Sequence, residues 1–183
     1  IEGARHHINM LFFKFEDDAA GRRIADALIR KSEEGVLVRL IYDDAGNLMV
    51  PRRFYRKLRK HGIQVRGFIR IFLPILSRDY NSRNHRKVVV IDGRVGYMGG
   101  MNIAQRYAEG LKWGIWRDTH MRITGPAVSE LQTSFLTDWK FTKGDEPDLA
   151  PMYPYNPPCG NTLMQIVTGG PMDKWNVMMQ AYM

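Results

Sequence analysis

Runs of apolar residues alternate with segments of helical periodicity over most of the chain. The apolar runs predict strands, over residues 8–15, 36–42, 63–68 and 88–91, with further strands over 94–98 and 117–124. Apolar residues three or four positions apart predict helices, over residues 21–34, 51–61, 103–109 and 126–141. These elements follow one another without a break, and together they predict one folded unit over residues 1–143.

The composition changes after this unit. Residues 144–162 are charged and then Pro-rich, which is typical of a linker. Residues 163–183 then predict the truncated start of a second unit, with a strand over 163–167 and a helix over 173–183. Residues 69–83 show no clear period, and they fit either a buried strand with a loop or an exposed lip over a site.

The chain is basic, with 27 Lys and Arg against 19 Asp and Glu, for a net charge of +8 over 183 residues. This charge suits an anionic partner such as nucleic acid, lipid headgroups or a phosphorylated substrate, although it also simply favours solubility. Residues 51–61 carry six of the basic side chains, either as a solvated face or as a surface that meets anionic headgroups. The single cysteine, Cys159, excludes an intrachain disulfide and suggests no cysteine-based metal site. There is no run of 18 apolar residues, and because the chain begins with Ile1 we expect it to be a piece of a longer protein.

One stretch carries candidate chemistry, at the start of the strand over residues 88–91. Side chains alternate along a strand, so His85 and Lys87 are expected on one face, about 6 to 7 Å apart. At that spacing an imidazole and an ammonium can bind one phosphate together. Taken alone, a histidine before a strand is more often structural, and a lysine is usually a solvated charge.

The residues after this strand add to the pattern. Asp92 and Gly93 predict a two-residue hairpin turn. Gly99 and Gly100 lack side chains, so their backbone N–H groups could approach an anion closely, although such a pair is more often only a turn. Asn102 is a suitable N-cap for a helix that begins near residue 103.

Six of these residues fit the spacing H-x-K-x4-D-x6-G-(G/S)-x-N: His85, Lys87, Asp92, Gly99, Gly100 and Asn102. This pattern resembles the signature of the phospholipase D superfamily. The segments GVLVRLIYDDAG, WRDTHMRITGPAV and LQTSFLTDWKF are similar to the bacterial cardiolipin synthase branch. The resemblance implies an α/β fold, with a mixed β-sheet flanked by helices on both faces. The chain would then form one phospholipase D-like repeat plus the start of a second.

The resemblance also implies a mechanism that uses no metal and no cofactor. One histidine attacks phosphorus and forms a phosphohistidine, and a second histidine protonates the leaving alcohol. His85 matches the family histidine, while Lys87, Gly100 and Asn102 match the residues that hold the phosphate. Asp92 matches the motif aspartate, but its position on a turn favours a structural role over proton transfer.

The family uses two copies of the motif, whereas this sequence has one. The resemblance therefore implies half of an active site, completed by a later part of a longer chain or by a homodimer. The expected function is a phosphatidyltransferase that joins two phosphatidylglycerol molecules and releases glycerol. We expect this part of the protein to lie peripherally at the bacterial cell membrane, to which a longer parent protein could be anchored. One alternative is a phosphodiesterase or endonuclease that acts on nucleic acid as a homodimer. Another is a non-enzymatic half retained for assembly or membrane binding.

A nucleophilic histidine needs an acceptor for the proton on its other ring nitrogen. Asp92 lies beyond four buried residues of the same strand and is too distant from His85 to accept it. Asp118 lies at the start of the strand predicted over residues 117–124, and this strand could lie beside the His85 strand. The resemblance points the same way, because relatives carry an acidic residue downstream of the motif. We therefore expect Asp118 within about 3 Å of the His85 ring, although it could instead pair with Arg117 or cap a turn.

Overall fold

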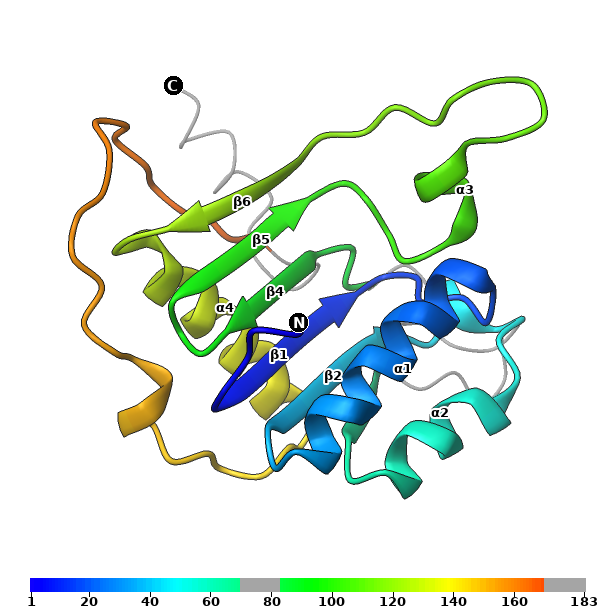
Figure 1. Cartoon of the computed structure of the whole chain (residues 1–183), viewed down its shortest axis with the longest axis horizontal. Coiled ribbons are helices and arrows are strands. Elements are labelled where there is room, and N and C mark those ends of the chain that lie inside the picture. Colours follow the sequence, from blue (N-terminus) through cyan, green and yellow to red (C-terminus); the bar gives the residue numbers. More distant parts are fainter. Residues whose placement is uncertain (70–82, 170–183) are drawn as a thin grey trace.

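The computed structural model describes residues 1–69 and 83–169, and it contains one six-stranded mixed sheet in the order β3-β2-β1-β4-β5-β6 (Figure 1). Strands β1, β2 and β3 are parallel to one another, while β4, β5 and β6 add antiparallel pairings on the other side of β1. The strands are β1 (His7–Phe12), β2 (Leu37–Asp43), β3 (Gln64–Phe68), β4 (Lys87–Ile91), β5 (Val95–Gly99) and β6 (His120–Thr124).

Helices cover both faces of this sheet, as the family resemblance implies (Figure 1). Figure 1 shows α1 (Ala19–Glu33) and α2 (Arg52–Lys60) in front of the sheet and α4 (Ala127–Phe141) behind it. The short helix α3 (Gln105–Glu109) lies beyond the end of β5, and two single-turn 3₁₀ helices, η1 (Ala45–Asn47) and η3 (Ala150–Met152), complete the secondary structure of the described residues.

The central strand β1 is mainly apolar because it is buried on both faces of the sheet. Successive side chains of a strand point to opposite faces. Ile8 and Met10 belong to the core under α1 and α2, whereas Leu11 packs with Phe135 of α4. Burial on both faces favours apolar residues, and the two polar side chains of the strand are themselves buried.

The hairpin predicted at Asp92 and Gly93 is confirmed. Both residues have positive φ, 53° and 62°, which is the geometry of a type I′ turn. The N–H of Arg94 donates to the carbonyl of Ile91 at 3.0 Å and closes the turn.

Two predicted details are wrong. Helix α3 begins at Gln105 and not near residue 103, and its N-cap is Ala104, so Asn102 does not cap it. The segment over residues 163–167 forms no strand, because it pairs with neither β3 nor β6 at the edges of the sheet. Ile166 packs instead against the core formed by β4, β6 and α4. The helix predicted over 173–183 lies outside the described residues.

The Pro-rich segment after α4 packs against the sheet. Met152 is buried, and its sulfur accepts from the side-chain amides of Asn9 and Gln132 at 3.8 Å. The amide of Asn156 donates to the carbonyl of Gly93 at 2.7 Å. The segment thus closes over the turn between β4 and β5, with contacts that proline content alone does not predict.

Candidate active site

The candidate site lies along the edge of the sheet that is formed by strand ends, at the point where the central strands β1 and β4 end and begin, respectively. The two strands are antiparallel, and Phe12 at the end of β1 is the register partner of Lys87 at the start of β4. Because β1 and β2 are parallel, the residues that follow both strands also reach this edge. Side chains from separate parts of the sequence meet here.

His85 and Lys87 are neighbours, as strand alternation predicts. The Nζ of Lys87 lies 2.9 Å from Nδ1 of His85 and donates to the His85 carbonyl at 2.6 Å. The ring of Phe13 lies 4.5 Å from the His85 ring, and Lys87 Nζ lies 5.5 Å from the same Phe13 ring. His85 is exposed and Lys87 is buried, so an ammonium stands at the base of an accessible imidazole.

This arrangement lowers the pKa of both groups. Burial lowers the pKa of Lys87 to about 8, an effect that the Asp118 carboxylate partly offsets. Partial burial, and then the nearby Lys87 charge, lowers the pKa of His85 below its ordinary value of 6.5. At neutral pH His85 is therefore mainly a neutral imidazole, and its Nδ1 electron pair faces the ammonium of a lysine that is mainly charged.

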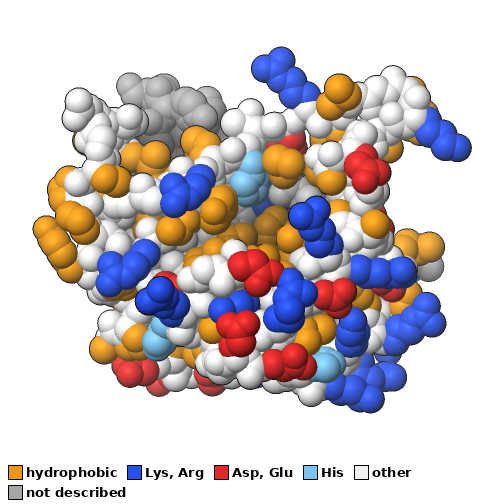
Figure 2. Space-filling model, in the orientation of Figure 1, with side chains coloured by type: hydrophobic (Ala, Val, Ile, Leu, Met, Phe, Trp, Pro, Cys, Tyr) orange, Lys and Arg blue, Asp and Glu red, His pale blue; other side chains and the backbone are white. Residues whose placement is uncertain are grey.

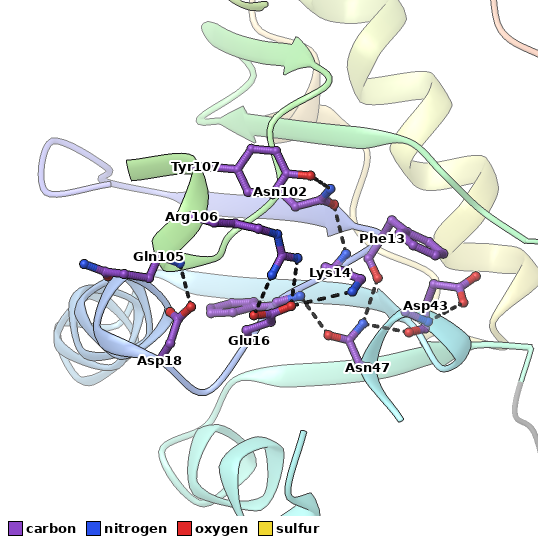
Figure 3. Close-up of polar contacts among 12 residues, drawn as sticks. Phe13, Lys14, Glu16, Asp18, Asp43, Asn47, Asn102, Gln105, Arg106 and Tyr107 are labelled. Atoms are coloured by element: carbon purple, nitrogen blue, oxygen red, sulfur yellow. Dashed lines mark hydrogen bonds and ion pairs between the residues drawn. The ribbon is translucent and has the colours of Figure 1, made fainter. Parts of the chain in front are cut away.

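A buried polar framework fixes the backbone around this pair (Figure 3). The carboxylate of Asp43 accepts from the N–H of Ala45 at 2.9 Å and from the N–H of Asn84 at 3.0 Å. Desolvation raises the pKa of Asp43, and the backbone N–H groups that it binds counteract this. The amide of Asn47 donates to the carbonyls of Phe13 and Asp43, each at 2.7 Å. Asp43, the last residue of β2, thus fixes the turn that follows this strand, and it also anchors the residue before His85.

Asn102 reaches the same edge from the segment between β5 and α3. Its amide oxygen accepts from the N–H of Lys14 at 3.0 Å, and its amide nitrogen donates to the hydroxyl of Tyr107 at 2.9 Å (Figure 3). Lys14 follows Phe13 in the chain, so Asn102 is held beside the residue that contacts both His85 and Lys87. One hydrogen of the amide remains for a ligand.

Gly100 has a different role from the one expected. Its N–H donates to the carbonyl of Thr119 at 2.9 Å and is not free for an anion. A Cβ at Gly100 would stand 2.1 Å from Oδ1 of Asp118. The glycine therefore provides space, which lets the Asp118 carboxylate lie against the backbone of the motif.

The expected hydrogen bond between Asp118 and His85 is not formed. Strand β5 lies between β4 and β6, so Asp118 approaches the motif across β5 and not beside His85. Its Oδ1 accepts from the N–H of Thr119 at 2.7 Å. The electrostatic effect of Asp118 falls on Lys87 and His120, whose pKa values it raises against the lowering effect of burial.

His120, the first residue of β6, is a site residue that the sequence analysis did not identify. It pairs with Gly99, and continuing the β4–β5 register by one residue places Gly99 opposite Lys87. A Cβ at Gly99 would stand 2.8 Å from Nδ1 of His120. The glycine thus leaves His120 and Lys87 on one face with no side chain between them. Spacing of two residues from Asp118 along a strand is the signal that could have identified it.

Asp92 lies at the opposite end of β4 from Lys87. Its carboxylate accepts from the N–H groups of Arg5, His6 and His7 at 2.9, 2.8 and 2.9 Å. Burial opposes the charged form, but these three donors outweigh it and lower the pKa of Asp92. The geometry gives Asp92 a structural position that fixes the chain before β1.

The described residues contain no group of three or more His, Cys, Asp or Glu side chains that could hold a metal ion. Over the same residues, no helix is both long enough and apolar enough to cross a membrane.

Solved structures with this fold include NucT from Helicobacter pylori, with a TM-score of 0.59, 17% identity, and coverage of 76% of this chain and 82% of that one. The phospholipase D family member Nuc from Salmonella typhimurium has a TM-score of 0.54 and 21% identity over 78% of this chain and 80% of its own. At these identities the likeness concerns the fold.

Curated relatives match the whole sequence. Cardiolipin synthase 2 of Bacillus cereus is 40% identical over 186 residues, which is 100% of this chain and 36% of that protein. The major cardiolipin synthase ClsA of Bacillus subtilis is 40% identical over 189 residues, 100% of this chain and 38% of its own. The chain thus spans little more than a third of the length of these relatives. The family profile described as "Cardiolipin synthase, PLD-like domain" matches residues 1–139. The chain therefore belongs to the cardiolipin synthase family of phospholipase D-like domains.

Proposed function

We propose that this protein is a phosphatidyltransferase of cardiolipin synthase type, which joins two phosphatidylglycerol molecules and releases glycerol. The observation that carries the proposal is the contact between His85 and Lys87 at 2.9 Å, in a chain that belongs to this family. A neutral imidazole beside a buried ammonium suits attack on an anionic phosphodiester.

In the first step a ring nitrogen of His85 attacks the phosphorus of phosphatidylglycerol, and the bond from phosphorus to the glycerol oxygen breaks. The phosphatidyl group is then bound to His85, and glycerol leaves after taking a proton from a second histidine. In the second step a hydroxyl of another phosphatidylglycerol attacks the phosphorus of the phosphohistidine and gives its proton to the second histidine. The bond from phosphorus to the His85 nitrogen breaks, which restores both histidines. The lowered pKa of His85 supports this role, because only the neutral ring has an electron pair to donate.

Two hydrogen-bond acceptors compete for the Lys87 ammonium in this scheme, the His85 ring and the substrate phosphate. In the free protein its ammonium lies on Nδ1 of His85. A phosphate oxygen is a stronger acceptor than an imidazole nitrogen, so substrate would draw the ammonium onto the phosphate and release Nδ1. The remaining amide hydrogen of Asn102 would bind a second phosphate oxygen. Lys87 and Asn102 would then stabilise the charge that develops at phosphorus.

The second histidine would come from another copy of the motif, either further along a longer chain or in a homodimer. The share of the relatives that this chain spans, 36 to 38%, is compatible with a longer protein. The proposed partners are phosphatidylglycerol and the surface of the bacterial cell membrane in which it lies. For residues 1–183 alone we expect little turnover unless two copies pair through the His85 face.

The test is to incubate the protein with phosphatidylglycerol vesicles and, separately, with plasmid DNA. We expect cardiolipin and glycerol in equal amounts, and a phosphatidyl adduct on the His85 peptide by mass spectrometry after acid-free quenching. Cleavage of DNA with no cardiolipin would favour the homodimeric phosphodiesterase instead. Absence of both products in the longest available form of the protein would favour the non-enzymatic half.

A further inference from the structure

The connection between α3 and β6 projects from the body of the protein and carries apolar side chains at its tip. Trp113 is 84% exposed and Ile115 is 90% exposed, and Trp116 beside them is also exposed. Figure 2 shows this end of the molecule with hydrophobic side chains extending outward and Lys or Arg side chains beside them. Single exposed apolar residues are common on soluble proteins, but three within four positions on a projection are not.

This projection has a defined shape. The N–H of Leu111 donates to the carbonyl of Gly114 at 2.7 Å, and the N–H of Gly114 donates back to Leu111 at 3.0 Å. These two bonds close a tight turn from Leu111 to Gly114, and Trp113 is one of its two central residues. The ring of Trp116 lies 5.4 Å from the ring of Tyr107, whose hydroxyl accepts from Asn102. The projection is therefore attached directly to a residue of the candidate active site.

The projection is also cationic. Lys112 and Arg117 are exposed on either side of the apolar side chains, and neither forms an ion pair with any carboxylate of the described residues. No acidic residue lies between them in the sequence. Tryptophan with flanking Lys or Arg is the composition that favours the interfacial layer of a bilayer, where the ring enters among the headgroups and the cation meets lipid phosphate.

A second apolar tip lies at the same edge of the sheet. Leu48 and Met49 are exposed after η1, and Met49 is 95% exposed. They follow Asn47, which binds the backbone of Phe13 beside His85. Arg52 and Arg53 come next, at the start of α2, so this tip also joins apolar side chains to cations.

We propose that these two tips insert into the interfacial layer of an anionic phospholipid bilayer and hold the His85 site at the plane of the headgroups. The inference rests on the proposed function for its substrate, since a phosphatidyl group stays anchored in the bilayer by its acyl chains. A nucleic acid would use the aromatic rings by stacking, but it would gain nothing from Ile115 or Met49. A protein partner would have to supply carboxylates for Lys112, Arg117, Arg52 and Arg53, none of which forms an ion pair within the described part of the chain.

The test is binding of the purified protein to vesicles of phosphatidylcholine with and without phosphatidylglycerol, followed by co-sedimentation. We expect binding that needs the anionic lipid and weakens as salt rises. The double variant W113S/I115S should bind on the order of 100-fold more weakly, because two apolar side chains no longer leave water. The matched control Y155S/L163S changes two side chains that are 81% and 99% exposed but distant from the tips, and it should bind like the wild type.

A second measurement locates the insertion. Phospholipids brominated along the acyl chain should quench part of the tryptophan fluorescence, and W113F should lose that part while it still binds. Equal binding by W113S/I115S and the wild type, or no quenching at Trp113, would overturn the proposal. So would a change in self-association of W113S/I115S with no change in vesicle binding, because the tips would then cover a protein surface. The variant H85A should bind vesicles normally, so a failure of catalysis is distinguished from a failure of insertion.

Discussion

The ammonium of Lys87 stands 2.9 Å from Nδ1 of His85, so the two groups titrate as neighbours and not independently. The charge on Lys87 is one reason why the pKa of His85 lies below 6.5, after partial burial of the ring. Burial brings the pKa of Lys87 itself to about 8. Within the proposed function, the reactive form of the pair is the one with His85 neutral and Lys87 charged.

Replacing His85 by alanine should remove the nucleophile without disturbing the fold, because the side chain is exposed. We expect cardiolipin formation by the longest available form of the protein to fall by on the order of 10⁴-fold or more, measured as product from phosphatidylglycerol. His61→Ala is the matched control, since His61 is a surface histidine paired with Glu33 on the α1–α2 side of the molecule. Turnover by His85→Ala near that of the control would contradict the assignment of the nucleophile.

The pH profile of kcat/KM should be bell-shaped. On the acid side activity falls as His85 gains a proton, with a midpoint below 6.5 because its pKa is lowered. On the alkaline side activity falls near pH 8 as Lys87 loses its proton. The alkaline limb of kcat should lie at higher pH, because bound phosphate stabilises the ammonium. In Lys87→Gln the acid limb should move to higher pH, since the neighbouring positive charge is gone; an unmoved limb would show that the two groups are not coupled.

Periodicity identifies most of the fold because each element buries a face. The run over residues 8–15 becomes β1, and the amphipathic stretch over 126–141 becomes α4. The failures have local physical causes. The apolar run over 163–167 has strand composition but no pairing edge, and the proline-rich segment before it packs through Met152 and Asn156, which composition does not predict.

The sequence predicts those residues of the site that lie on one segment. It does not predict those whose contacts depend on which strands are neighbours in the sheet. Alternation is sufficient for His85 and Lys87, which share one segment. The contacts of Phe13 and His120 depend on the sheet order β1-β4-β5-β6, and that order is not encoded in any one segment. The same order explains the error at Asp118, because the intervening β5 separates it from His85.

Gly100→Ala tests whether this glycine provides space for Asp118. The new Cβ would stand 2.1 Å from Oδ1 of Asp118, so the carboxylate or the backbone must shift. We expect a loss of about 1 to 3 kcal/mol in the free energy of unfolding, measured by urea denaturation, together with reduced turnover. Gly3→Ala is the control, because a Cβ there has no neighbour within 4 Å. Equal stability of the two variants would argue against the steric role.

Asp92→Asn tests the structural assignment of the motif aspartate. One carboxylate serves three backbone N–H groups, and an amide is a weaker and less symmetrical acceptor. We expect about 2 kcal/mol less stability at neutral pH, with the catalytic pH profile unchanged in the protein that remains folded. The pKa of Asp92 is lowered in the folded state, so its contribution is present above the ordinary value of 3.8 and is lost as pH falls through the lowered folded value. A stability difference that persists in strong acid would indicate another cause.

Asp118→Asn separates two possible roles of this carboxylate in the proposed reaction. If Asp118 keeps Lys87 charged, its removal lowers the pKa of Lys87 further below about 8, because burial then acts without opposition. The alkaline limb of kcat/KM should therefore move to lower pH while the acid limb set by His85 stays in place. If Asp118 instead moves to His85 and fixes its tautomer when substrate binds, the rate should fall at every pH with both limbs unmoved. The geometry favours the first outcome, since Asp118 lies against Gly100 and contacts no ring nitrogen of His85. Asp118→Glu is the control: it keeps the charge, so under the first role the alkaline limb should remain near that of the wild type even if the rate falls.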